Sequence, residues 1–177
     1  MFVGSCSTSA VRSLTFAAIA AGAIVIGAAT RFGGPWISVE TPVNPYDSST
    51  RGAVLLVHTF HHGTAEFMPV AGRAEGLVDG QRRSMDISLD KSSREGTYGV
   101  QRQWGAKGIW TLLFTATPRE HGGIGSIQAA VDIGANGDLE RVSIPRTAQS
   151  IPRQLTVAEV DRSLRERAKL PVAVGAR

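Results

Sequence analysis

Three of the four histidines in this 177-residue chain lie within five positions of one another, at His58, His61 and His62. Met68 follows six positions after the last of them, and the fourth histidine, His121, lies further along the chain. Imidazole and thioether groups together suit copper. The sequence therefore raises a metal site as one hypothesis, with these five side chains as candidate ligands and copper as the one cofactor considered.

The spacing of the histidines limits how they could share an ion. If one strand runs through all three, His58 and His62 share a face about 13 Å apart, and His61 points to the other face. One ion cannot then take both. A turn at Gly63 would bring His61 or His62 toward the methionine. The alternative interpretation is that these residues end a strand and are satisfied by packing and backbone groups.

Other catalytic patterns are missing from the sequence. No Gly-x-Ser-x-Gly motif occurs, so the usual nucleophile turn of a serine hydrolase is not indicated. Residues 122–125 are rich in glycine but lack the Lys-Ser/Thr of a phosphate loop. The acids Asp86 and Asp90 fall on a predicted exposed strand face beside Lys91, which favours simple solvation. We therefore expect no catalytic constellation and no enzyme activity.

Composition indicates which class of protein this is and which partners are not expected. The hydrophobic fraction is 42% and the charged fraction 19%, which is typical of a globular domain. The formal charge is +4, but the 19 basic residues are scattered among 15 acids, so no basic stripe predicts nucleic-acid binding. Arg82-Arg83 could dock an acidic partner or anionic lipid, although a solvated turn explains the pair equally well.

The N-terminal thirty residues have the pattern of an export signal. A polar stretch ending at Arg12 precedes an uncharged, Ala- and Gly-rich run over 13–30, which closes on the small residues 27–29. This predicts a signal peptide over 1–29, with an uncleaved membrane anchor as the alternative. Either outcome puts the rest of the chain in the periplasm or outside the cell. Cys6, the one cysteine, precedes the apolar run and is not placed as a lipoprotein cysteine.

The body of the chain alternates between short apolar runs and turn signals. Asp79-Gly80 and Asn136-Gly137 are favoured hairpin turns, because both positions tolerate positive φ. No helical pattern interrupts residues 35–146. The sequence predicts an all-β domain there, an antiparallel immunoglobulin-like β-sandwich of about 7–8 strands. The expected strands cover 36–40, 53–60, 70–78, 81–89, 97–104, 109–117, 126–133 and 139–144.

Residues 96–117 hold two of the three tryptophans and one of the two tyrosines. The pattern predicts two strands joined by a short turn flanked by Gly105 and Gly108, which together form a core hairpin. Its large side chains should hold the two sheets together, each ring burying roughly 150–250 Å². These side chains are Tyr98, Trp104, Trp110, Leu112 and Phe114.

The C-terminal part predicts one helix within 154–170. Thr156 and Glu159 form a capping box, and apolar residues follow at helical spacing. Its charged face is most simply a solvated one, and 171–177 is expected to be a tail. That face consists of Asp161, Arg162, Arg165, Glu166 and Arg167.

Three short motifs, Pro69-Val70-Ala71-Gly72, Gly96-Thr97-Tyr98 and Gly108-x-Trp110-Thr111-Leu112, give the chain a family resemblance. It resembles YtkA-like and FixH-like extracytoplasmic domains over about 36–117. The resemblance implies an immunoglobulin-like sandwich, and FixH-like proteins are membrane-anchored and linked to copper-oxidase assembly. We expect an exported, non-catalytic accessory or interaction domain with a protein partner in the cell envelope. Metal handling and an enzyme of unknown reaction are the alternatives.

Overall fold

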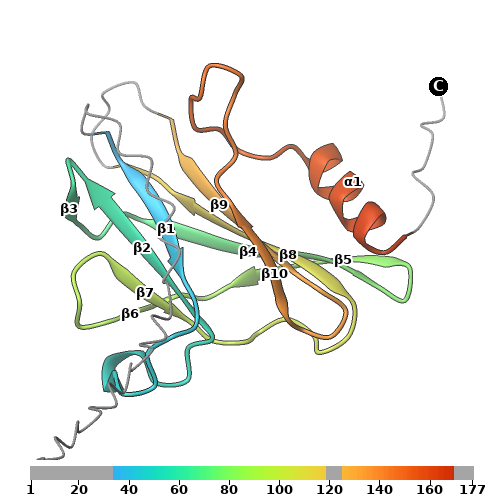
Figure 1. Ribbon diagram of the computed structural model, residues 1–177, viewed down its shortest axis with the longest axis horizontal. Helices are drawn as coiled ribbons and strands as arrows, with labels where there is room; N and C mark the ends of the chain where they lie inside the picture. Colours follow the sequence, from blue (N-terminus) through green and yellow to red (C-terminus); the bar gives the residue numbers. More distant parts are fainter. Residues whose placement is uncertain (1–33, 119–124, 170–177) are drawn as a thin grey trace, which may run out of the picture.

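The computed structural model describes residues 34–118 and 125–169. Within them the chain forms ten strands, one short 3-10 helix and one α-helix. The strands make two antiparallel sheets of five strands each (Figure 1). This confirms the prediction of an all-β, two-sheet protein with a C-terminal helix. The predicted signal peptide or anchor and the tail lie outside the described residues.

The first sheet has the strand order β1-β2-β7-β6, with β3 added beside β2. A 3-10 helix, η1 (Ser48–Thr50), lies in the loop between β1 and β2. The register pairs Trp36 with Phe60, and their rings stack with centroids 3.9 Å apart. The strands are β1 (Trp36–Glu40), β2 (Leu55–His61), β3 (Thr64–Ala65), β6 (Asp90–Lys91) and β7 (Thr97–Val100).

The second sheet has the order β10-β9-β8-β4-β5. The β4–β5 turn is confirmed, since Asp79 and Gly80 have φ of 50° and 75° and join strands paired in register. The β9–β10 turn also includes the predicted Asn136-Gly137 pair. The strands are β4 (Val70–Val78), β5 (Gln81–Ile87), β8 (Ile109–Ala116), β9 (Ile127–Ile133) and β10 (Leu139–Ser143).

The main core lies between the two sheets. Leu55 and Val57 of β2 meet Leu112 and Phe114 of β8 there, all at most 1% exposed. Burying each such side chain contributes roughly 1.5–3 kcal/mol relative to exposure. The continuous apolar run of β2 and the alternation of β8 in the sequence therefore predicted these core positions correctly.

The predicted core hairpin over 96–117 is wrong in its pairing. Thr97–Val100 forms β7 of the first sheet, whereas Ile109–Ala116 forms β8 of the second. The segment crosses from one sheet to the other instead of turning back on itself. Its rings still pack in the shared core, where Tyr98, Trp104 and Trp110 are each at most 6% exposed. Apolar alternation predicts which side chains are buried, but not which strands exchange hydrogen bonds.

The C-terminal helix, α1 (Val157–Arg167), begins with the predicted capping box between Thr156 and Glu159. A hydrogen bond from Arg153 and those from Thr156 lower the pKa of Glu159 to about 2. The helix lies on the outer face of the second sheet, where Val160 and Leu164 form a small second core with Leu77. Among the described helices, none is long and apolar enough to cross a membrane.

Candidate functional site

The histidine region ends in a tight turn. β2 stops at His61, and His62 and Gly63 adopt φ of 50° and 80° before β3 pairs back at Thr64. Of the two conformations considered from the sequence, a continued strand and a turn at Gly63, the structure therefore has the turn. A left-handed pair at the two turn positions is the geometry of a two-residue hairpin.

The turn brings two of the five candidate metal ligands together. The rings of His61 and His62 lie 4.1 Å apart, and His61 Nδ1 is 3.5 Å from a carboxylate oxygen of Glu66. Met68 is 2% exposed within the main core, and His121 lies outside the described residues. Within residues 34–118 and 125–169, no three His, Cys, Asp or Glu side chains form a group that can hold a metal ion.

His58 belongs to a different cluster. Its Nε2 lies 2.9 Å from Glu40 and its Nδ1 3.1 Å from the Thr97 hydroxyl. With Glu40 ionised, Nε2 must carry a proton, so in the neutral ring Nδ1 accepts from Thr97. Burial lowers the pKa of His58 below its ordinary value, against the raising effect of Glu40.

A carboxylate, an imidazole and a hydroxyl in a row have the order of a hydrolase triad. Here the hydroxyl cannot act on a substrate, because Thr97 is 3% exposed in the strand β7. The three groups instead join β1, β2 and β7. Arg94 lies 4.0 Å from Glu40 of this cluster and 3.5 Å from Asp47. It thereby connects the cluster to the loop that contains η1.

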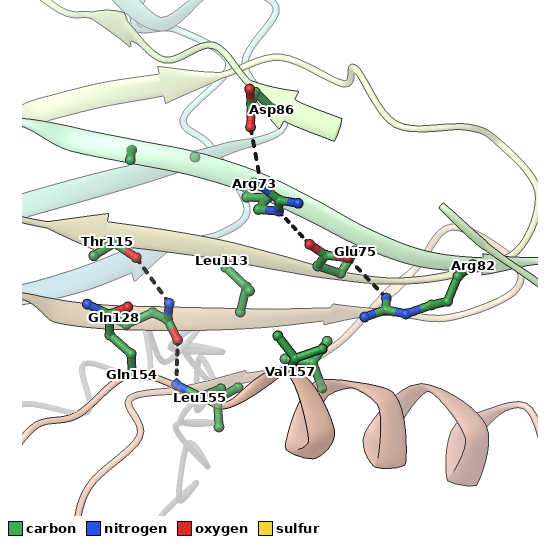
Figure 2. Close-up of a pocket in the computed structure, with 13 residues that line it drawn as sticks. Arg73, Glu75, Arg82, Asp86, Leu113, Thr115, Gln128, Gln154, Leu155 and Val157 are labelled. Carbon is green, nitrogen blue, oxygen red and sulfur yellow. Dashed lines mark hydrogen bonds and ion pairs between the residues drawn. The ribbon is translucent and has the colours of Figure 1, made fainter. Parts of the chain in front are cut away.

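A concave surface lies elsewhere, beside α1. A groove of about 470 Å³ separates the residues before and within α1 from the outer face of the second sheet (Figure 2). That volume falls in the range of ordinary ligand sites. Its lining comes from β4, β5, β8, β9 and the segment 154–160.

The floor of the groove is apolar. Leu113 and Val160 belong to the small core beneath α1, and Val157, on the first turn of the helix, is 75% exposed. The small core therefore opens to solvent at this end. Gln128 closes one end of the groove, since its amide donates to Thr115 and accepts from the backbone of Leu155.

A chain of alternating charges forms the wall (Figure 2). Glu75 is its centre and contacts Arg73 at 2.5 Å and Arg82 at 3.1 Å. Arg82 reaches on to Asp161 of α1 at 2.5 Å, whereas Asp86 stands 4.0 Å from Arg73. Burial opposes ionisation of Glu75, but hydrogen bonds from Arg73 and Ser84 and the nearby guanidinium charges leave its pKa lowered.

The far end of α1 is fastened by a buried ionic network. Arg167 donates to Thr111 at 2.6 Å and to the Ile133 carbonyl at 3.1 Å, and it lies 3.3 Å from Asp132. Asp132 is 4% exposed and also accepts two hydrogen bonds from Arg141. The expectation that the charged face of α1 is only solvated is therefore wrong for Arg167, and also for Asp161.

The sequence reasoning missed the groove, although part of its signal was present. Strand β9 is buried at all seven positions, including Gln128 and Asp132. Polar residues inside such a strand indicate that its second face is covered. What covers it is the segment before α1 and the helix itself, which strand periodicity cannot reveal.

Comparison with known proteins assigns no family or function to this chain. No family model, no curated protein and no solved structure matches the chain.

Proposed function

We propose that this protein is an exported, non-catalytic binding module of the cell envelope, which holds a segment of a partner protein in the groove beside α1. The observation that carries the proposal is the open apolar floor between Leu113 and Val157. A ligand-sized hollow of this kind, with an apolar floor and polar groups at its wall, is the default location of a binding site.

The polar groups of the groove support binding over catalysis. Glu75 and Arg82 are occupied by ion pairs inside the wall, and Gln128 is occupied by Thr115 and Leu155. No nucleophile with an adjacent base lines the groove, and such a pair is what covalent catalysis needs. Charges fixed in this way give shape and specificity to a surface.

An immunoglobulin-like topology and a relationship to YtkA-like and FixH-like domains belong to the same proposal. Two antiparallel sheets packed face to face are the architecture such domains share. The uncharged run over 13–30 supports export. Because many roles occur on one sandwich, the groove and not the fold carries the functional argument.

The proposal is tested by photo-crosslinking in the producing cell. A p-benzoylphenylalanine at position 157 of the full-length protein should form an adduct with one partner protein. The same residue at position 46 serves as a matched control, because Tyr46 is 93% exposed but lies on the loop before β2. The adduct should disappear when Leu113→Glu places a charge on the groove floor. No adduct from position 157, or the same adduct from both positions, contradicts the proposal.

Metal handling is a second candidate, favoured by the contact between His61 and His62. Two adjacent imidazoles offer nitrogen donors of the kind that Cu²⁺ binds. We expect titration with Cu²⁺ to show a site that the double variant His61→Ala/His62→Ala lacks and that His58→Ala retains. Equal binding by all three proteins would remove the hairpin as a copper site.

A further inference from the structure

One row of cross-strand partners in the second sheet, here called a rung, places an apolar side chain beside charged ones. Leu113 of β8 and Arg73 of β4 are cross-strand partners, so their Cβ atoms lie about 5 Å apart on the same face. Asp86 of β5 is the next partner along the rung. Across the groove, the sheet therefore offers an aliphatic side chain, a guanidinium and a carboxylate in that order (Figure 2).

Arg73 retains capacity for another acceptor. Its side chain is 57% exposed even though its Nε contacts Glu75. The carboxylate of Asp86 is 93% exposed and 4.0 Å away, longer than a hydrogen bond. A guanidinium has five N–H donors in a fixed fork, which suits bidentate contact with a carboxylate. Arg73 is thus the groove cation that can bind a further acid, since Arg82 is shared by Glu75 and Asp161.

The apolar side chain of the rung, Leu113, can also accept a further contact. Leu113 is only partly buried, and Val157 overhangs it from the first turn of α1. An aliphatic side chain inserted here would extend the small core that Val160 and Leu164 begin. In an extended segment, side chains two positions apart lie about 6.8 Å apart on one face. Two such side chains can therefore reach Leu113 and Arg73 together, because these two residues are direct cross-strand partners.

Resting on the function proposed above, we propose that the groove binds an extended protein segment in which an aliphatic residue stands two positions from an acidic one. The aliphatic side chain packs on Leu113 and Val157, and the carboxylate contacts the exposed edge of Arg73. The formal charge is +4 for the whole chain and +3 for the part after residue 29, because Arg12 is the one charged residue before it. A positive charge favours encounter with an acidic partner.

Fluorescence anisotropy with the full-length protein tests this chemistry. The probe is a labelled peptide, Gly-Ser-Leu-Ser-Asp-Ser-Gly, blocked at both ends; in two further peptides lysine replaces its aspartate or serine replaces its leucine. The first peptide should bind about tenfold more tightly than either of the others, the effect of one charge-assisted contact. Its affinity should fall as salt rises.

Protein variants assign the effect to the groove. Arg73→Gln should weaken the leucine–aspartate peptide about tenfold and leave the lysine peptide no weaker, whereas the exposed Arg83→Gln serves as a charge-matched control. Leu113→Ser should weaken binding of the same peptide although Arg73 is intact. It provides a second, independent test if Arg73→Gln is unstable. Thermal unfolding confirms that each variant is folded.

Two results overturn the inference: tighter binding of the lysine peptide, or binding that Arg73→Gln does not change. Absence of binding by all three peptides overturns it as well. The crosslinking experiment at position 157 separates this failure from that of the proposed function. An adduct there with no acidic-peptide binding leaves the groove a binding site for a segment of different chemistry.

Discussion

At the scale of single residues, the polar side chains of this protein are mostly committed to one another. His58 is fixed between Glu40 and Thr97, and Arg167 is fixed among Asp132, Thr111 and a backbone carbonyl. Groups used in this way stabilise the fold and are not free for chemistry. We place the binding hypotheses at Arg73, which keeps an exposed edge beside Glu75, and at the adjacent rings of His61 and His62.

Trp110 is the residue whose loss the main core should tolerate least. It is 4% exposed and lies on Gly76, the cross-strand partner whose missing side chain leaves room for the indole. Trp110→Ala should lower the free energy of unfolding by about 3–5 kcal/mol, measured by urea denaturation. Trp110→Phe should cost less, because most of the buried ring remains. An unchanged midpoint for the alanine variant would contradict burial of this ring.

His58 predicts a dependence of stability on pH. Its pKa in the folded protein is below the ordinary value of 6.5, chiefly because of burial. Between those two pKa values the unfolded chain binds more protons, so stability falls as the pH drops below about 6.5. In His58→Gln this part of the pH profile should flatten, as measured by denaturation between pH 7.5 and 5. An equally steep profile in the variant would assign the effect to other groups.

At the scale of elements, α1 is what turns a sandwich face into a groove. Its capping box starts the helix, its apolar side chains pack on β4 and β8, and Arg167 fastens its last turn to the sheet. An isolated helix of 11 residues is marginal in water. The groove therefore depends on the contacts that hold the helix in place.

Arg167→Ala should release the C-terminal end of α1. Asp132 keeps its hydrogen bonds with Arg141, so we expect a loss of about 1.5–3 kcal/mol, typical of hydrogen bonds to charged groups. Amide exchange in α1 should accelerate more than exchange in β2 or β7. The neighbouring Arg165→Ala, also in the last helical turn, is the control and should have little effect. Equal effects of the two variants would mean that the buried network does not hold the helix.

At the scale of the whole molecule, the two sheets differ in what they can offer a partner. The first sheet carries the Glu40–His58–Thr97 cluster. The second sheet is covered by α1 (Figure 1) and lines the groove. Export would present these surfaces to proteins of the cell envelope. Because the sequence has no cysteine after Cys6, no disulfide can join two segments of the sandwich, which relies on its two cores for stability.

Export itself makes a prediction about the mature chain. Mass spectrometry of the protein recovered from the cell envelope should show a species that begins just after Ala29, because residues 27–29 offer the small side chains that signal peptidases accept. A species retaining residues 13–30 in the membrane fraction would favour the anchor. Recovery of the intact chain from the cytoplasm alone would contradict both.

The sequence by itself determined the local features of this protein. Alternating apolar residues predicted most strands and the side chains of the main core, Asp79-Gly80 predicted its hairpin, and Thr156 with Glu159 predicted the start of α1. Each of these depends on neighbours within a few positions, whose preferences are written in the residue types themselves. The presence of His61, His62 and Arg73 was visible too, but not their surroundings.

The tertiary structure decided what depends on distant segments. It assigned β7 and β8 to different sheets, placed His58 in a cluster apart from His61 and His62, and buried Met68 in the core. It also joined Arg167 to Asp132 and formed the groove from strands and a helix far apart in the chain. Periodicity tells which face of a strand is buried, but strand pairing and helix docking depend on long-range packing that no local pattern encodes.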